Sequence, residues 1–131
     1  ANYGWPVATF GREYVTGLKI GAGPALEGTM PPLWQWTPSI APSGMAFYTN
    51  DRIAAWQGSL LVGALKYRLL ARLEGETTGL VERERLFEGR FGRIRNVEVD
   101  DQGRVYLLTD AGDGKLIRIE AAAGPQATIL E

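Results

Sequence analysis

The sequence contains no cysteine and no histidine among its 131 residues. The absence of cysteine excludes disulfide bonds, thiolate zinc sites and a cysteine nucleophile from this chain. The absence of histidine removes the commonest general base and the commonest side-chain metal ligand. Any catalysis carried by this chain alone would therefore depend on carboxylates, lysine, tyrosine or a bound cofactor.

The sequence also lacks an excess of basic residues and a long apolar run. Lysine and arginine number 14 against 15 acidic residues, which gives a formal net charge of −1. Nucleic-acid-binding surfaces usually carry a basic excess, so we expect no nucleic-acid partner. No run of about 18 apolar residues is present, so we expect no membrane span. The chain starts at Ala1 without a recognisable signal peptide, which fits a processed product or a fragment.

The hydrophobic pattern of the sequence changes near residue 44. Residues 1–43 are rich in glycine and proline and lack a clean hydrophobic period, which predicts loops and short extended pieces. Residues 44–131 contain short, often alternating apolar runs separated by glycine or aspartate, which predict consecutive antiparallel strands. The sequences DDQG (100–103) and DAGDG (110–114) supply the turn residues between strands.

Short stretches of the strand-rich part recur at a constant spacing. LARLE at 70–74 returns as LIRIE at 116–120, and GSLLVGA at 58–64 returns loosely as GRVYLLT at 103–109. A repeat of about 40–50 residues with four strands in each unit is typical of β-propeller blades. The pattern therefore predicts an all-β chain of about two blades, although two unrelated hairpins of a β-sandwich would leave a similar pattern. The blades would span residues 44–90 and 91–131.

Four motifs, taken in order, resemble one known family. They are NYGWP (2–6), WTPSIAPSGMAFY (36–48), LLVGALK (60–66) and RIRNVEVDDQGRVYLLTD (93–110). Together they resemble the soluble pyrroloquinoline quinone (PQQ)-dependent sugar dehydrogenases, and most closely the aldose sugar dehydrogenase branch of the glucose/sorbosone dehydrogenase family. The resemblance implies a six-bladed β-propeller with the quinone on its top face. Family members are much longer, so this chain would be the C-terminal part.

The resemblance also implies an activity. It is the oxidation of the anomeric hydroxyl of an aldose sugar to a lactone, with hydride transfer to PQQ, and the family setting is periplasmic or secreted. The family's histidine base would lie outside this chain, so we expect no catalytic residue here and no activity without the missing N-terminal blades. The electron acceptor is not implied. The alternative is a non-catalytic propeller fragment or binding module, stabilised by a partner or by self-association.

Arg93 and Arg95 are the main candidates for binding an anion. Alternate residues of a strand share a face, so the two guanidiniums would point the same way and repel each other unless an anion lies between them. The resemblance implies that both arginines and Lys66 hold the cofactor, since guanidinium binds carboxylates bidentately and stacks on flat rings. The alternative is that the arginines pair with Glu98 or Asp100 on an exposed face, and that Lys66 is a solvated strand-end charge.

The resemblance implies ligand-binding roles for three further residues. Trp34 matches an aromatic residue of the cofactor pocket, and Ser39 matches a hydroxyl offered to a cofactor carboxylate. Tyr3 matches a position whose backbone carbonyl binds calcium, a cation that prefers oxygen ligands. The acidic calcium ligands of the family would lie outside this chain. The alternative for Trp34 and its neighbour Trp36 is that both pack a loop against the propeller rim.

Two charged segments are interpreted as structural. The segment VERERLFEGR (81–90) predicts a solvated outer strand, in which a change such as Glu82→Ala would leave cofactor binding unchanged. The segment DAGDG (110–114) resembles a calcium loop only superficially, because the distal bidentate glutamate is missing, and it predicts a hairpin turn.

Overall fold

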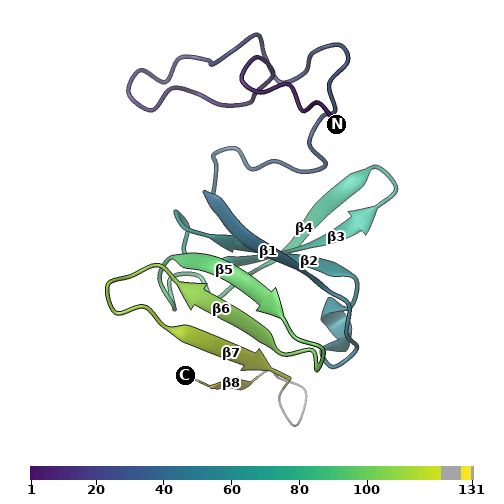
Figure 1. The fold of residues 1–131 in the computed structure, drawn as a ribbon, viewed down its shortest axis with the longest axis vertical. Coiled ribbons are helices and arrows are strands. Elements are labelled where there is room, and N and C mark those ends of the chain that lie inside the picture. Colours follow the sequence, from purple (N-terminus) through teal and green to yellow (C-terminus); the bar gives the residue numbers. More distant parts are fainter. Residues whose placement is uncertain (122–127, 131) are drawn as a thin grey trace. The chain divides into compact units, whose positions relative to one another are not determined.

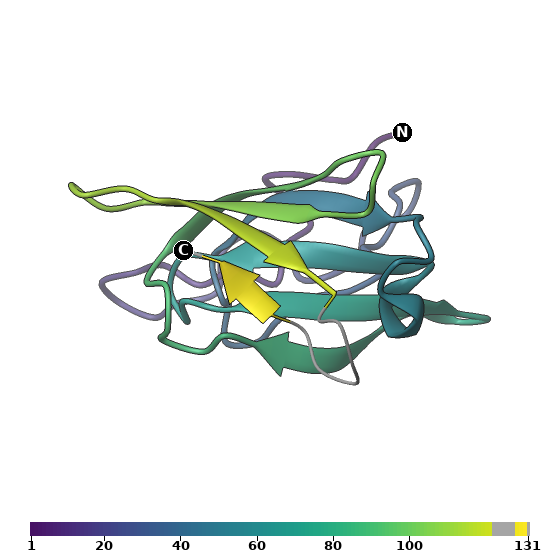
Figure 2. The same ribbon diagram turned by 90° about the horizontal axis from the view of Figure 1, so that it is seen from below.

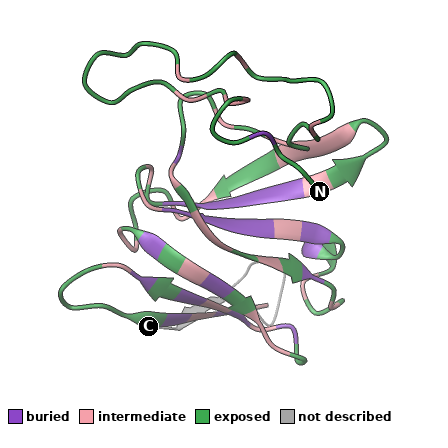
Figure 3. Cartoon of the chain, turned by 45° about the horizontal axis from the view of Figure 1, so that its top comes forward, coloured by how far each residue is buried: buried purple, intermediate pink, exposed green. Residues whose placement is uncertain are grey.

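The computed structural model describes residues 1–121 and 128–130. It divides the chain into two compact units, Ala1–Gln35 and Trp36–Glu131. The first unit is built from turns and two isolated bridges, Ala8 with Gly23 and Arg12 with Lys19. Nearly all of its residues are exposed or half-buried (Figure 3). This architecture agrees with the irregular, glycine-rich sequence of the segment.

The second unit contains two four-stranded antiparallel sheets (Figure 1). The strands of the first sheet are β1 (Pro42–Tyr48), β2 (Ser59–Ala64), β3 (Leu70–Glu76) and β4 (Gly79–Leu86). Those of the second are β5 (Ile94–Val99), β6 (Val105–Thr109), β7 (Leu116–Glu120) and β8 (Thr128–Leu130). A short 3-10 helix, η1 (Ala54–Trp56), connects β1 to β2 and is the only helix among the described residues. The all-β prediction is therefore confirmed, and no described helix is long and apolar enough to cross a membrane.

Both sheets are sequential meanders, with strand orders β1-β2-β3-β4 and β5-β6-β7-β8. The echoed sequences occupy equivalent places in them. LARLE begins β3 and LIRIE forms β7, and these are the third strands of their sheets. The other recurring pair, GSLLVGA and GRVYLLT, lies on the second strands, β2 and β6. Two successive four-stranded meanders with matching strand sequences are the organisation of neighbouring propeller blades.

Each turn between the strands of the second sheet that the sequence predicts is closed by a side chain that accepts backbone N–H groups. One carboxylate oxygen of Asp100 accepts the backbone N–H groups of Gln102 (3.0 Å) and Arg104 (2.9 Å), which closes the turn between β5 and β6. Gly103 completes this turn with a φ of 73°, a conformation that glycine adopts without strain. The turn between β6 and β7 is closed by paired bonds between Thr109 and Lys115. Both turn predictions are confirmed.

The core of the second unit lies between the two sheets. It consists of buried side chains from both: Tyr48, Trp56, Leu61, Leu70, Ile94, Val97, Val105, Leu107, Ile117 and Ile119. The sheets meet through β5, which packs against β1 and β2 (Figures 1 and 2). Contact is therefore concentrated near the first strand of each sheet, as between propeller blades, rather than spread over both sheets as in a closed sandwich.

Two glycines allow this close approach. A Cβ atom on Gly44 of β1 would lie 2.1 Å from Asn96 Oδ1 and 2.6 Å from Asn96 Cα. A Cβ atom on Gly63 of β2 would lie 2.8 Å from Cγ2 of Ile94. Because real Cβ contacts are longer than these, the junction between the sheets requires residues without side chains at both positions.

One buried charge stabilises the first sheet. Arg72 of β3 is 6% exposed and donates hydrogen bonds to Ser59 (2.9 Å), Glu84 (3.1 Å) and Glu74. Burial alone would lower the pKa of this guanidinium, but the two glutamates raise it on balance. A buried charge is tolerated when it is paired and hydrogen-bonded in this way, so we assign Arg72 a structural role.

Candidate functional site

The candidate site begins where the loop before β1 pairs with the residues after β2. The backbone N–H of Lys66 donates to the carbonyl of Ile40 (3.1 Å), and the N–H of Leu65 donates to the carbonyl of Ala41 (3.0 Å). The hydroxyl oxygen of Ser39 accepts the N–H of Ala41 at 3.1 Å, which leaves the hydroxyl hydrogen available for another acceptor. These bonds place Ser39 and Lys66 at the same end of the first sheet.

The second sheet contributes the start of β5 to this end. The hydroxyl of Ser43 donates to the carbonyl oxygen of Ile94 at 2.6 Å, and Gly63 packs against the same residue. Ile94 is the first residue of β5, and Arg93 directly precedes it. The loop with Ser39 and Lys66 and the segment with Arg93 and Arg95 therefore adjoin the same junction between the sheets.

Arg93 and Arg95 share one carboxylate oxygen. Oδ2 of Asp110 accepts bonds from Nε and Nη2 of Arg93 (3.0 and 2.9 Å) and from Nη2 of Arg95 (2.7 Å). The two guanidiniums thus point the same way, as the strand pattern predicts. Both arginines are about half exposed. The Arg93 bonds, followed by those of Arg95, hold the pKa of Asp110 below its ordinary value, although desolvation opposes them.

A β-bulge brings the two arginines to this aspartate. Ile94 pairs with Thr109, but the next paired residue, Asn96, is opposite Leu108, so Arg95 is the extra residue of the bulge. A bulge re-aims the side chain that it carries. The N–H of Asp110 also donates to the carbonyl of Arg93 at 2.8 Å, which fixes the aspartate beside the start of β5.

The alternative partners that the sequence suggested for these arginines are wrong. Glu98 accepts a hydrogen bond from Asn96 (3.1 Å). Asp100 binds Arg104 (2.7 Å) and the hydroxyl of Tyr106 (3.2 Å) at the opposite end of β5. Both acids lie further along the chain than the bulge at Arg95, whereas the backbone N–H of Asp110 donates to the carbonyl of Arg93 at the start of β5.

The site retains an unmatched positive charge. Two guanidiniums face one carboxylate, and each guanidinium has five N–H donors, of which Arg93 uses two and Arg95 uses one for Asp110. The remaining donors can bind a second anion, bidentately if it is a planar carboxylate. Chemically, this arrangement can hold an organic carboxylate next to the junction of the sheets.

Lys66 lies at this end of the sheets, and its ammonium group contacts a neighbouring aromatic ring. Nζ lies 5.5 Å from the ring centroid of the neighbouring Tyr67, within the range of a cation–π contact. The ion pairs of the described residues do not include Lys66. The structure therefore brings the backbone of Lys66 to the site, and the exposed Lys66 side chain contacts the half-buried ring of Tyr67.

Trp34 and Tyr3 belong to the first unit, Ala1–Gln35. The side chain of Trp34 is half-buried, and Tyr3 is 66% exposed. The described residues contain no group of three acidic, histidine or cysteine side chains that could hold a metal ion. Calcium binding at the carbonyl of Tyr3 stays a prediction.

Glu82 is less exposed than the prediction of a solvated outer strand requires. Its side chain is 16% exposed and accepts a hydrogen bond from Nε1 of Trp36 and another from Nε of Arg85 (2.6 Å). The alternating charge pattern of β4 concealed this role, because the acceptor's partner lies 46 residues earlier in the chain. Glu82 holds the loop before β1 against the outer strand of the sheet.

Sequence comparisons match this chain to sugar dehydrogenases. The family model described as Glucose / Sorbosone dehydrogenase matches residues 1–118. An aldose sugar dehydrogenase of Escherichia coli K12 is 39% identical over 120 residues, which cover 90% of this chain and 32% of that protein.

Solved structures agree with the sequence matches. A crystal structure of a glucose dehydrogenase superimposes with a TM-score of 0.85 at 46% identity, covering 92% of this chain and 36% of that chain. The PQQ-bound form of an aldose sugar dehydrogenase from Streptomyces coelicolor superimposes with a TM-score of 0.63 at 27% identity, covering 91% of this chain and 33% of that chain. The present chain spans about a third of the length of these relatives.

Proposed function

Because this chain belongs to the glucose/sorbosone dehydrogenase family, we propose that it forms the cofactor-binding part of a PQQ-dependent aldose sugar dehydrogenase. The observation that carries the proposal is the pair Arg93 and Arg95, held on one aspartate with donors to spare. The proposal is supported by a relative whose structure is described as PQQ-bound. The whole enzyme would need further blades, since the chain spans about a third of its relatives.

The chemistry of the donors suits this cofactor. PQQ is a flat ring system with three carboxylates, and guanidiniums can bind such groups bidentately or stack on the ring. Arg93 and Arg95 would bind carboxylates with their remaining donors, while Asp110 keeps their positions fixed. Lys66 would exchange its contact with Tyr67 for a carboxylate, and Ser39 would donate its hydroxyl hydrogen. Trp34 belongs to the other unit, and its role in the cofactor pocket stays a prediction from the family resemblance.

The remaining parts of the activity would come from outside this chain. When bound, the quinone accepts the hydride from the anomeric carbon of an aldose, and the sugar becomes a lactone. The residues of this chain would bind and orient the cofactor, and the base that takes the hydroxyl proton would lie in the other blades. Calcium would bind the carbonyl of Tyr3 together with external ligands. A periplasmic or secreted location remains a proposal by family resemblance.

A chimeric enzyme tests this assignment. In it, the present chain replaces the matching third of the E. coli aldose sugar dehydrogenase, and cofactor binding is followed by the absorbance of the quinone. We expect Arg95→Ala to weaken binding by about 1.5–3 kcal/mol, the scale of a hydrogen bond to a charged group. We expect Arg93→Lys to weaken it as well, because lysine offers only a point charge.

Arg83→Ala is the matched control, since Arg83 forms its ion pairs with Glu74 and Glu76 on the outer strands. A folded chimera in which Arg95→Ala and Arg83→Ala titrate alike would refute the cofactor-site assignment. A folded chimera that binds no quinone at all would favour the alternative, a non-catalytic blade pair.

A further inference from the structure

The first unit contains a small hairpin whose two opposed residues are both basic. The N–H of Glu13 donates to the carbonyl of Leu18 (2.9 Å), and the N–H of Ile20 donates to the carbonyl of Gly11 (3.2 Å). These bonds flank Arg12 and Lys19, which form an antiparallel bridge as a non-hydrogen-bonded pair. Side chains in such pairs approach closely on one face, and like charges placed there destabilise the pairing.

No acid of the unit offsets this repulsion. Arg12 and Lys19 are the only basic residues among positions 1–35. Neither takes part in an ion pair of the described residues; Arg12 donates to the carbonyl of Gly17 (2.9 Å), which uses one of its five donors. Glu13 accepts a bond from Thr16 instead. An external anion between the two cations would remove the repulsion.

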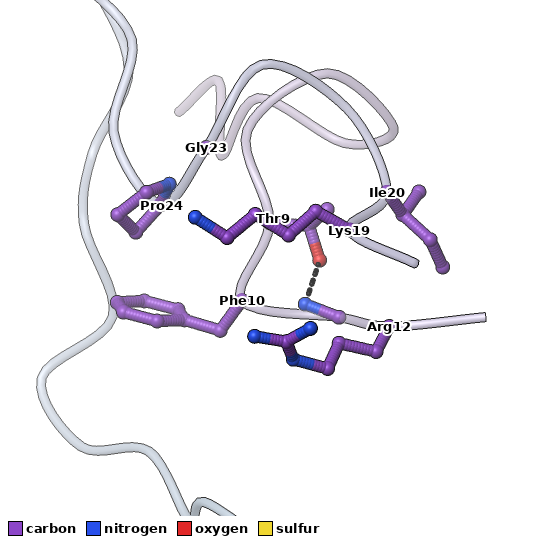
Figure 4. A pocket seen from close by; sticks show the side chains of 8 residues that line it. Thr9, Phe10, Arg12, Lys19, Ile20, Gly23 and Pro24 are labelled. Atoms are coloured by element: carbon purple, nitrogen blue, oxygen red, sulfur yellow. Dashed lines mark hydrogen bonds between the residues drawn. The ribbon is translucent and has the colours of Figure 1, made fainter. Parts of the chain in front are cut away.

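The two basic side chains border a hollow of about 230 Å³. Phe10 and Pro24 form its apolar side, and Figure 4 shows the head groups of Arg12 and Lys19 extending toward that side. The hydroxyl oxygen of Thr9 accepts the N–H of Gly11 (2.9 Å), so its hydrogen is available to a ligand. Ligand pockets for drug-sized molecules are larger, about 300–1,000 Å³, so this hollow suits a smaller molecule.

The backbone that shapes the hollow is closely packed. The N–H of Thr9 donates to the carbonyl of Gly23 (2.7 Å), and the N–H of Ala22 donates to the carbonyl of Val7 (2.8 Å). Gly21 has a φ of 67°, and a Cβ atom there would lie 2.2 Å from the carbonyl oxygen of Val7. The two sides of the hollow are thus fixed by backbone bonds and by a position that only glycine can occupy.

We propose that this hollow binds a small polyhydroxy carboxylate of the sugar-acid class. The carboxylate would lie between Arg12 and Lys19, a ligand hydroxyl would accept from Thr9, and the carbon skeleton would cover Phe10 and Pro24. The choice of sugar acids rests on the proposed function. Water adds to the carbonyl carbon of the lactone product, the ring C–O bond breaks, and one sugar carboxylate and one proton result. The site would therefore sense the hydrolysed product.

The test is a titration of the full 131-residue chain with gluconate, followed by NMR at low ionic strength and without cofactor. We expect shifts confined to residues 9–24, and none with neutral glucose at the same concentration. Arg12→Gln and Lys19→Gln should each weaken binding about tenfold, the effect of losing a charged hydrogen bond. Lys115→Gln is the matched control and should change nothing, because Lys115 is an exposed lysine of the other unit.

Several results would overturn the proposal. One is that glucose binds as well as gluconate, and another is that gluconate binds the Arg12→Gln/Lys19→Gln variant unchanged. A third is that inorganic phosphate binds as tightly as gluconate and that Phe10→Ala changes the affinity for neither anion. That result would show a site for anions in general. The titration is repeated in the chimera. If the chimera binds quinone but not gluconate, only the present proposal is overturned. If it binds gluconate but not quinone, only the proposed function is overturned.

Discussion

The hydroxyl of Tyr48 donates a hydrogen bond to the carbonyl oxygen of Gly103 at 2.9 Å, across the junction between the two sheets. Tyr48 ends β1 in the first sheet, and Gly103 lies in the turn between β5 and β6 of the second. The same hydroxyl accepts the backbone N–H of Ile53 at 3.0 Å. One fully buried side chain therefore links both sheets and the connection that contains η1.

We predict that Tyr48→Phe destabilises the chain by about 1–3 kcal/mol, because it leaves a buried carbonyl and a backbone N–H without their partner. The measurement is urea unfolding. An unchanged midpoint would show that the hydroxyl does not stabilise the junction.

Stability at alkaline pH should depend on the same residue. Burial raises the pKa of Tyr48 above its ordinary value of 10.0. The unfolded chain then loses this proton at a lower pH than the folded chain, so the stability is complete below pH 10 and declines as the pH rises toward the folded value. Tyr48→Phe should flatten this decline. The same slope in both proteins would contradict the assignment.

The junction should not tolerate a side chain at Gly44. We predict that Gly44→Ala destabilises the chain by about 1–3 kcal/mol, since the new methyl group would overlap the backbone of Asn96 and force β1 away from β5. Gly75→Ala in β3 is the control, because a Cβ atom there meets nothing within 4 Å. Urea midpoints of the two variants should differ clearly, and equal midpoints would disprove close packing at Gly44.

Glu82 should matter more than a nearby exposed glutamate. Glu82→Ala removes the acceptor of the Trp36 indole N–H, and we predict a loss of about 1–3 kcal/mol together with a change in tryptophan fluorescence. Glu88→Ala, at an exposed position, should leave both unchanged. Identical behaviour of the two variants would mean that the contact contributes nothing.

The arginine pair should control the titration of Asp110. We predict that an Arg93→Gln/Arg95→Gln variant raises the Asp110 pKa toward its ordinary 3.8. In the wild type, the stability from this carboxylate is present above that value and is lost as the pH falls through the lowered pKa. The variant should lack this acid-dependent loss. Carboxyl NMR measures both proteins.

Asp100 is the internal control for that titration. Desolvation raises its pKa, but the hydrogen bonds from Arg104 lower it on balance, independently of the other two arginines. Its titration should therefore be the same in both proteins. A shift of Asp100 equal to that of Asp110 would indicate a general change of the fold instead.

The strands and their grouping could be predicted from the sequence because they depend on local patterns. The recurrence of LARLE as LIRIE marked β3 and β7 as equivalent, and both strands bury the second and fourth residues of the repeated stretch, Ala71 and Leu73 in β3 and Ile117 and Ile119 in β7. The aspartate- and glycine-rich stretches marked turns because these residue types favour turn conformations. Neither inference required knowledge of the contacts between distant residues.

The partners of the site's charged side chains could not be predicted, because they depend on contacts between residues that are distant in the sequence. Strand alternation predicts that Arg93 and Arg95 point the same way, and they do, but it predicts neither the bulge at Arg95, which changes the register against β6, nor their partner Asp110. Asp110 was interpreted as a turn residue, which it also is. Likewise, the role of Glu82 depends on a loop 46 residues away. The roles proposed for Lys66, Ser39, Trp34 and Tyr3 stay predictions.

The charged outer strand β4 has a consequence for the chain during its synthesis. In strand order, β4 is the last strand of its sheet, and it presents Arg83, Glu84 and Arg85 along its exposed positions. An unpaired strand edge is a template for another chain, and charged side chains make such pairing costly. Newly made copies that emerge close together on a polysome should therefore not join through this edge. The strand that ends the sheet would also keep crowded nascent copies apart.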